Sequence, residues 1–219
     1  MSEIIYKTFR IKFEKTGVAK YISHLDLSRV FARSLARAGV EIMHSEGFNP
    51  RPKIVFASAL SLGVESLCEF ADIRVGTQSP LPPFQKGALK DEIYEKIKCV
   101  FPQGINIIKV YEAKNEFKNI DRTRYNIFLN LDEDDVDEIK RFFEDDVIVE
   151  KKPGIEINLK DYICGINISG ELIDAAVKTN QEMFLNPENI IKGVKLRCDV
   201  GDYYIKKIEV FDKNNVVFE

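Results

Sequence analysis

Residues 6–39, "YKTFRIKFEKTGVAKYISHLDLSRVFARSLARAG", change from one periodicity to another. Apolar and basic residues alternate over positions 9–13, which is the period of a strand that is buried on one face. Ser23 is a favourable N-cap residue, and Asp26 follows it as an aspartate variant of the capping box. Gly39 is the residue type that commonly ends a helix. The stretch therefore predicts a half-buried strand followed by a helix.

Further apolar patterns extend this start into a complete supersecondary unit. The apolar face of the first helix is predicted to consist of Leu27, Val30, Phe31, Leu35 and Ala38. Strands are predicted at 53–60, 68–76 and 105–114, and a second helix, introduced by three prolines, at 84–101. The order β-α-β-β-α-β is that of a ferredoxin-like unit, in which both helices cover one face of an antiparallel sheet.

The second half of the chain repeats this order in a degraded form. Residues 115–124 are polar and are interpreted as a connector. The predicted elements are a strand at 125–132, a helix at 132–145, a hairpin about 153–154, a strand at 171–179, a short helix at 186–194 and a last strand at 203–213. We therefore expect an α+β chain with two domains. The first is a ferredoxin-like domain over residues 1–114, and the second is an α+β half over 120–219.

Composition limits the class of protein. The chain has 219 residues, of which 45% are hydrophobic, enough for a substantial core. No run is long enough to cross a membrane, and the first residues lack a signal-peptide pattern, so we expect a cytoplasmic protein. The four cysteines are far apart in the sequence and form no metal-binding motif. We expect reduced, mostly buried thiols, and no metal, iron–sulfur cluster or other cofactor.

Charge is distributed unevenly along the chain. Residues 1–60 contain ten Lys/Arg and five Asp/Glu, a net charge of +5, whereas the whole chain has a net charge of −3. The remaining residues therefore have a net charge of −8. A basic region on an otherwise acidic protein indicates an anionic partner at one site.

Two groups of basic residues are candidates for that site. Arg29, Arg33 and Arg37 recur every four residues and share one face of the first helix, where guanidinium groups suit bidentate phosphate binding. His24 is at the positive end of the same helix. The alternative is that these arginines form an ordinary solvated surface and that His24 only caps or packs.

The second group is in the loop "HSEGFNPRPK", residues 44–53. Gly47 and Asn49 favour bends, and the two prolines that flank Arg51 stiffen the backbone, which lowers the entropy lost on binding. Arg51 and Lys53 would contact an anion, and Phe48 would stack on a base if it is exposed. A purely structural loop with a buried Phe48 is the alternative.

Three motifs in this region resemble a known family. "KYISHLDLSRVFARSLARAGV", "SEGFNPRPKIVFASALSLGVES" and "EFADI" are similar to the radical SAM-linked protein family. This is a bacterial domain of unknown function that stands alone or is fused to radical SAM proteins. The resemblance covers residues 3–200 in layout, with its specific motifs in 20–72. It implies a partner such as a radical SAM protein or a ribonuclease E/G-type enzyme. A histidine is common in the family where this chain has Arg51, which weakens a shared catalytic role for that position.

Three functions are compatible with the sequence. The leading hypothesis is a non-catalytic accessory protein that binds RNA or another anionic substrate, with its contacts at His24, Arg29, Arg33, Arg37, Phe48, Asn49, Arg51 and Lys53. An alternative is a metal-independent, ferredoxin-like RNA endonuclease, whose candidate acid–base residues are Tyr21, His24, His44 and Lys53. A third is a protein-interaction adaptor that uses the acidic stretch 132–138. The sequence alone does not identify the RNA, the partner enzyme or the oligomeric state.

Overall fold

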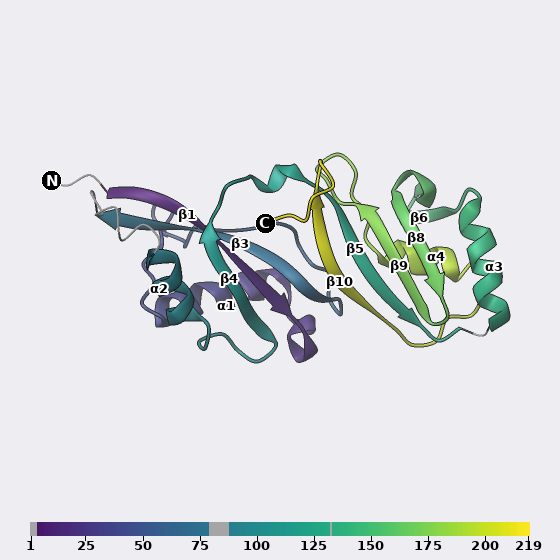
Figure 1. Ribbon diagram of the computed structural model, residues 1–219, viewed down its shortest axis with the longest axis horizontal. Coiled ribbons are helices and arrows are strands. Elements are labelled where there is room, and N and C mark those ends of the chain that lie inside the picture. The colour runs from purple at the N-terminus through teal and green to yellow at the C-terminus, as the bar shows by residue number, and fades with distance from the viewer. Residues whose placement is uncertain (1–3, 79–87, 132) are drawn as a thin grey trace. The chain divides into compact units, whose positions relative to one another are not determined.

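The chain forms two compact units, Met1–Glu116 (unit 1) and Phe117–Glu219 (unit 2). The computed structural model in Figure 1 describes residues 4–78, 88–131 and 133–219. Helices and antiparallel strands occur in both units, so this is an α+β protein, as predicted. None of the helices in the described part of the chain has both the length and the hydrophobicity that a membrane crossing requires.

Unit 1 contains four antiparallel sheet strands and two α-helices. Its elements are β1 (Ile4–Lys15), a 3-10 turn η1 (Gly17–Tyr21), α1 (His24–Arg37), β2 (Ile54–Phe56), β3 (Glu65–Gln78), α2 (Ala88–Ile97) and β4 (Ile105–Glu112). Strand β1 lies between β4 and β3. Ile73 of β3 pairs with Phe9 of β1 and with Ile54 of β2, which places β2 on the other edge of β3.

The predicted face of β1 is buried in a single hydrophobic core. Phe9, Ile11 and Phe13 are at most 2% exposed and pack in one cluster with residues of both helices. The cluster also contains Leu27, Phe31 and Leu35 of α1, and Ile93 and Ile97 of α2. Each such side chain contributes about 1.5–3 kcal/mol by its burial. The strand and helix predicted from residues 6–39 are therefore confirmed, including the cap, since the Ser23 hydroxyl accepts a hydrogen bond from the Asp26 amide.

The opposite face of β1 holds a buried ion pair that the alternation did not predict. Arg10 is fully buried, and its Nε and Nη2 atoms lie 2.8 and 2.9 Å from the two carboxylate oxygens of Asp72. Nη2 also donates to the Asn115 carbonyl oxygen at 2.9 Å, and Nη1 donates to the Asn115 side chain. Arg10 thus links β1 to β3 and to the segment that follows β4.

Unit 2 contains four antiparallel sheet strands, a separate hairpin and two α-helices. Its elements are η3 (Phe117–Asn119), β5 (Ile120–Leu129), α3 (Glu133–Glu144), β6 (Ile148–Lys152), β7 (Ile155–Asn158), η4 (Leu159–Asp161), β8 (Ile163–Ser169), β9 (Leu172–Lys178), α4 (Glu188–Val194) and β10 (Tyr203–Asp212). Within the sheet the order is β10-β5-β9-β8, and β6 pairs with β7 across the predicted turn.

The structure corrects several predicted boundaries. The interpretation of 115–124 as a connector is wrong from Ile120 onward, because β5 begins there. The polar residues of β5 have partners outside this strand: the Thr123 and Thr179 hydroxyls form a hydrogen bond of 2.7 Å, and Arg124 forms an ion pair with Asp174. Strand β8 was not predicted. Strand β2 covers only three residues of the predicted 53–60, and residues 84–87 of the predicted second helix are outside the described residues.

Candidate nucleic-acid interface

The first turn of α1 positions His24 at the edge of the hydrophobic core. The Ser23 cap fixes the start of the helix, and the hydrogen bond that Asp26 makes with Ser23, reinforced by Arg29, lowers the pKa of the Asp26 carboxyl. The His24 ring is exposed and packs edge-on against Phe56 of β2, with ring centroids 5.3 Å apart. His24 is therefore accessible, with one side of its ring fixed by packing.

The three arginines of α1 have different surroundings. Arg29 forms an ion pair with Asp26 at 2.8 Å, which offsets its charge. Arg33 and Arg37 line a hollow of about 260 Å³, the arginine groove, together with Val30, Ser34 and Pro102. Arg37 also donates a hydrogen bond to the Val100 carbonyl oxygen, which holds its guanidinium beside the segment after α2. Two of the three arginines thus share one concave surface.

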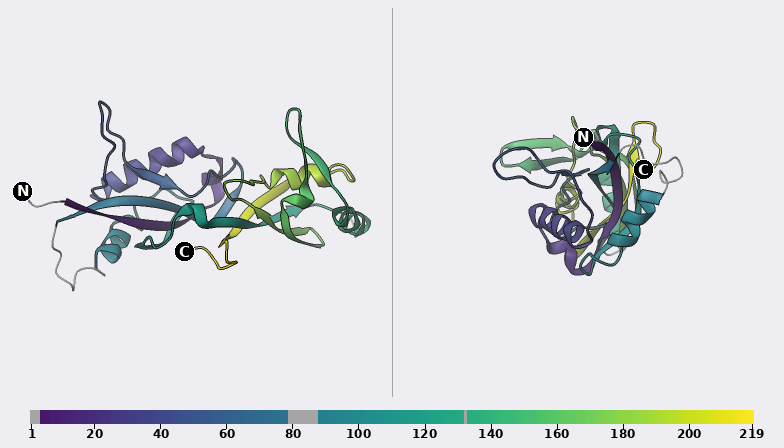
Figure 2. Two further views of the ribbon diagram at one scale, coloured as in Figure 1. Left: turned by 90° about the horizontal axis from the view of Figure 1, so that it is seen from above. Right: turned by 90° about the vertical axis from the view of Figure 1, so that its left-hand side faces the viewer.

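Residues 44–53, the projecting loop, leave the edge of β3 and return to it. The Met43 amide bonds the Arg74 carbonyl oxygen, and the Lys53 amide bonds the Met43 carbonyl oxygen, so both ends of the loop are fixed. Within it, the Ser45 amide donates to the Arg51 carbonyl oxygen and the Arg51 amide donates to the Ser45 hydroxyl oxygen. Figure 2 (left) shows the loop, in dark blue, rising away from α1.

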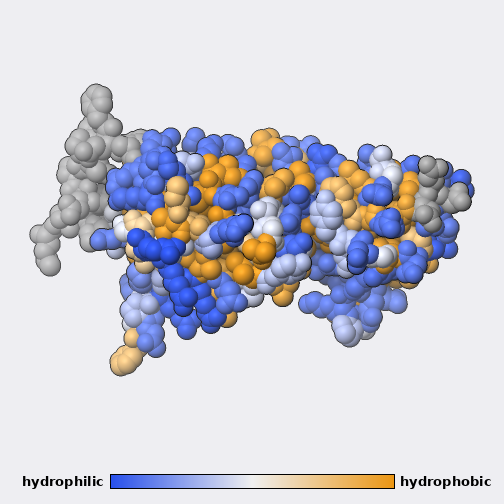
Figure 3. All heavy atoms as spheres, turned by 90° about the horizontal axis from the view of Figure 1, so that it is seen from below, coloured by the Kyte–Doolittle hydropathy of each residue, from blue (hydrophilic) through white to orange (hydrophobic). Residues whose placement is uncertain are grey.

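The tip of the projecting loop presents an aromatic ring to solvent. Gly47 has a φ of +124°, a conformation that other residues rarely adopt, and the chain bends there. Phe48 follows with a relative exposure of 104%, and Asn49 and Arg51 are also exposed. In Figure 3 the loop projects at the lower left, mainly hydrophilic along its length and hydrophobic at its end. The alternative of a buried Phe48 is therefore wrong.

The arginine groove and the projecting loop occupy different flanks of α1. His24 contacts Phe56 of β2, and the loop leads into that same strand. Arg37 lies about 140° around the helix axis from His24 at the usual spacing of about 100° per residue. Among the described residues, no hydrogen bond or ion pair joins the groove to the loop. The basic residues are therefore held in two groups.

The residues proposed for endonuclease chemistry have separate environments. His44 is at the base of the projecting loop, where its Nδ1 atom lies 3.0 Å from the Ile42 carbonyl oxygen. His24 instead packs on β2, and Tyr21 is exposed beside Lys20, whose Nζ atom lies 5.2 Å from the ring centroid. Each of these three side chains therefore makes its own contacts, with different neighbours.

Sequence reasoning missed a buried lysine below the start of α1. Lys15 is 1% exposed, and its Nζ atom donates to the carbonyl oxygens of Ile22 at 3.0 Å and Lys20 at 3.4 Å. Burial lowers the pKa of its ammonium group, and the negative charge of Glu69 opposes that shift. The sequence did indicate this burial, because Lys15 continues the two-residue alternation of buried positions that includes Phe13. Lys15 positions the turn that leads to His24.

The cysteines differ in part from the sequence prediction. Cys68 is buried, but Cys99 and Cys164 are exposed, because Cys99 follows the last turn of α2 and Cys164 is on the edge strand β8. All four are free thiols. In the described ranges, no group of three or more His, Cys, Asp and Glu side chains is arranged to hold a metal ion.

Comparisons with other proteins identify a family. No curated protein matches the chain. A crystal structure of an unknown protein from Galdieria sulphuraria matches 93% of this chain and 99% of that chain at 9% sequence identity, with a TM-score of 0.24, too low to support an argument. The family described as "Uncharacterized protein conserved in bacteria (DUF2344)" matches residues 8–187. Since this match covers most of the sequence, the chain belongs to that bacterial family.

Proposed function

We propose that the protein is an accessory protein that binds single-stranded RNA or a similar anionic strand through unit 1. The observation that carries this proposal is the fully exposed Phe48 ring at the tip of a loop that also presents Arg51. Aromatic side chains on which bases stack, next to cations that contact the backbone, are the usual elements of single-strand binding.

The construction of the projecting loop supports this role. Exposure of a phenylalanine ring to water is unfavourable, and this cost is relieved when a partner covers the ring. A nucleobase offers a flat apolar face of suitable size. Hydrogen bonds between Ser45 and Arg51 and the prolines on either side of Arg51 hold the loop in shape before a ligand arrives. Binding therefore orders fewer residues, which favours affinity.

The arginine groove adds a second set of phosphate contacts. Arg33 and Arg37 are exposed and share a hollow with Ser34, and neither has an acidic partner among the described residues. Unit 1 contains 17 Lys/Arg and 13 Asp/Glu, a net charge of +4, so its long-range field also attracts an anionic strand. Arg29, which is paired with Asp26, contributes less.

The fold type, the partner enzyme and the cellular location are part of the same proposal. The element order of unit 1 and the pairing of β2 with β3 on the side opposite β1 support a ferredoxin-like arrangement, with unit 2 as a degraded repeat. The motifs in 20–72 support a partnership with a radical SAM protein or a ribonuclease E/G-type enzyme in the bacterial cytoplasm. In this arrangement the protein presents an RNA strand, and the partner enzyme performs the chemistry.

Binding of a labelled single-stranded RNA, followed by fluorescence anisotropy, tests the proposal. Stacking of one base on an aromatic ring contributes about 1–3 kcal/mol, so Phe48→Ala should weaken binding about 5- to 150-fold. Phe184→Ala is the matched control, because Phe184 is a partly exposed phenylalanine in unit 2. Equal affinity of Phe48→Ala and wild type, or no binding by wild type in low salt, would show that the proposal is wrong.

Salt dependence separates the contributions of the loop and the groove. With about 0.7 counterions released per phosphate contact, a fourfold rise in salt should weaken binding about 7-fold for two contacts and about 50-fold for four. The smaller value corresponds to Arg51 and Lys53 alone, and the larger adds Arg33 and Arg37. The double variant Arg33→Glu, Lys53→Glu should abolish binding. Its matched control, Arg141→Glu with Lys213→Glu in unit 2, should retain it.

A further inference from the structure

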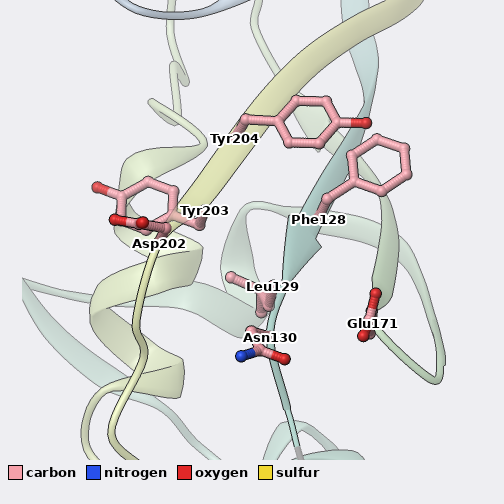
Figure 4. A pocket seen from close by; sticks show the side chains of 7 residues that line it. All are labelled: Phe128, Leu129, Asn130, Glu171, Asp202, Tyr203 and Tyr204. Atoms are coloured by element: carbon pink, nitrogen blue, oxygen red, sulfur yellow. The ribbon is translucent and has the colours of Figure 1, made fainter.

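A hollow of about 450 Å³ lies at one end of strands β5 and β10 in unit 2. We call it the acidic aromatic pocket, and Figure 4 shows its lining residues, Phe128, Leu129, Asn130, Glu171, Asp202, Tyr203 and Tyr204. Its volume is within the range of about 300–1,000 Å³ that small-molecule pockets commonly have. None of the functions considered from the sequence uses these residues.

An aromatic pair forms one wall of the pocket. Phe128 on β5 and Tyr204 on β10 are directly opposite each other in the sheet. Their rings stack with centroids 4.3 Å apart and planes inclined by 7°. Tyr204 remains 42% exposed, so part of this surface is open to a ligand. Alternate residues of the same strands, such as Ile127 and Ile205, are buried, so the pair lies on the opposite face of the sheet from the unit's core.

Two carboxylates and an amide line the same pocket. Glu171 and Asp202 are exposed, and neither forms an ion pair within the part of the chain that the structure describes. Asn130 lies between them in Figure 4, and the pocket lining contains no lysine or arginine. Unit 2 as a whole contains 15 Lys/Arg and 22 Asp/Glu, a net charge of −7. The charged lining residues and the net charge of unit 2 therefore both favour a cation.

The pocket is partly fixed before any ligand binds. The Tyr203 hydroxyl donates a hydrogen bond to Glu188 of α4 at 2.8 Å, and this bond raises the pKa of Tyr203. The Tyr203 ring is thereby held against the end of the sheet. Outside the lining, the Lys206 Nζ atom lies 5.9 Å from the centroid of the Tyr204 ring, so this ring already has a cation of the chain close to it.

We propose that the acidic aromatic pocket binds an arginine side chain from a basic segment of a partner protein. A guanidinium group is flat, so it can stack on the aromatic pair, and its fork of donors pairs with carboxylates. A lysine ammonium fits less well because it cannot do both with one planar group. The carboxylates repel a phosphate group, so this site and the proposed RNA site of unit 1 select ligands of opposite charge.

The test uses two fluorescein-labelled peptides, Gly-Arg-Gly-Arg-Gly and the same peptide with citrulline in place of both arginines. Citrulline keeps the shape of arginine but carries no charge. We expect the arginine peptide to bind the full-length protein weakly, and the citrulline peptide to bind at least about 5-fold more weakly, because cation–π contact and charge pairing are both lost. Binding is followed by fluorescence anisotropy in low salt.

Variants locate the bound peptide. Glu171→Gln and Asp202→Asn should each weaken binding of the arginine peptide about 1.5- to 5-fold, as for exposed ion pairs, and Tyr204→Ala should also weaken it. Lys206→Gln should strengthen it, because a like charge near the site is removed. Glu182→Gln, an exposed carboxylate of unit 2 outside the pocket, is the control and should have no effect.

Several outcomes would overturn the proposal. These are equal binding of the two peptides, binding that the pocket variants leave unchanged, and no binding of the arginine peptide at millimolar concentration. Displacement of the bound peptide by a neutral nucleoside instead of by free arginine would assign the pocket to a base and also overturn it. None of these results depends on whether unit 1 binds RNA.

Discussion

The substitution Asp72→Ala tests the structural role of the buried ion pair in unit 1. Arg10 is fully buried, and Asp72 accepts two of its hydrogen bonds at 2.8 and 2.9 Å. Loss of the carboxylate leaves a guanidinium charge in the interior with fewer partners. Removal of one member of a buried ion pair costs about 3–5 kcal/mol. For a chain of this size, that loss corresponds to a fall in melting temperature of about 6–20 °C.

Unit 2 contains a matched control in the Arg124–Asp174 pair. Arg124 Nε lies 2.8 and 3.1 Å from the two carboxylate oxygens of Asp174, but the Arg124 side chain is 45% exposed. Exposed pairs contribute about 0–1 kcal/mol, so Asp174→Ala should lower the melting temperature by no more than about 4 °C. The two variants differ mainly in how deeply the remaining arginine, Arg10 or Arg124, is buried.

Thermal unfolding followed by circular dichroism, with urea unfolding as a second measure, compares the variants. A combined Arg10→Met and Asp72→Leu protein should recover most of the stability, because apolar residues of similar volume can replace a buried pair. The reasoning is refuted if Asp72→Ala and Asp174→Ala lose the same stability.

Two further predictions concern the segment that positions α1. Burial lowers the pKa of Lys15 below its ordinary value of 10.5, so the unfolded state binds this proton more strongly than the folded state does. Wild type should therefore gain stability relative to Lys15→Met as the pH rises towards 10.5, and a constant difference in urea midpoints would contradict this. Gly104→Ala should destabilise unit 1 by more than about 2 kcal/mol, since the φ of Gly104 is +89° and an added Cβ would clash with the Thr16 carbonyl oxygen. Gly165→Ala, whose Cβ would meet no atom within 4 Å, should unfold like wild type.

The elements with a clear hydrophobic period were predictable from the sequence. Strand β1 and helix α1 alternate or repeat their apolar residues regularly, and the structure buries the residues that this pattern selects. Strand β8 and the start of β5 were missed for the opposite reason. Cys164 and Gly165 of β8 are exposed at the sheet edge, and the polar residues of β5 find their partners on neighbouring strands. Such pairings cannot be predicted from the sequence before the strand register is known.

Some features of the candidate site were likewise predictable from the sequence, and others were not. Turn residues indicated the projecting loop, and Gly47 has the positive φ that such a bend favours. The sequence could not decide whether Phe48 is buried or exposed, because phenylalanine is common in both settings near a strand. Helical spacing placed Arg33 and Arg37 on one face, but their shared hollow with Pro102 depends on where the segment after α2 packs. Long-range packing of this kind is not encoded in local periodicity.

Mapping the RNA contact by NMR tests the central claim most directly. Backbone amide signals of the full-length protein are recorded while a short single-stranded RNA is added in low salt. The account predicts that shifts concentrate in the projecting loop, above all at Gly47–Arg51, and in the residues that line the arginine groove. Shifts confined to unit 2, or no shifts at all, would contradict it.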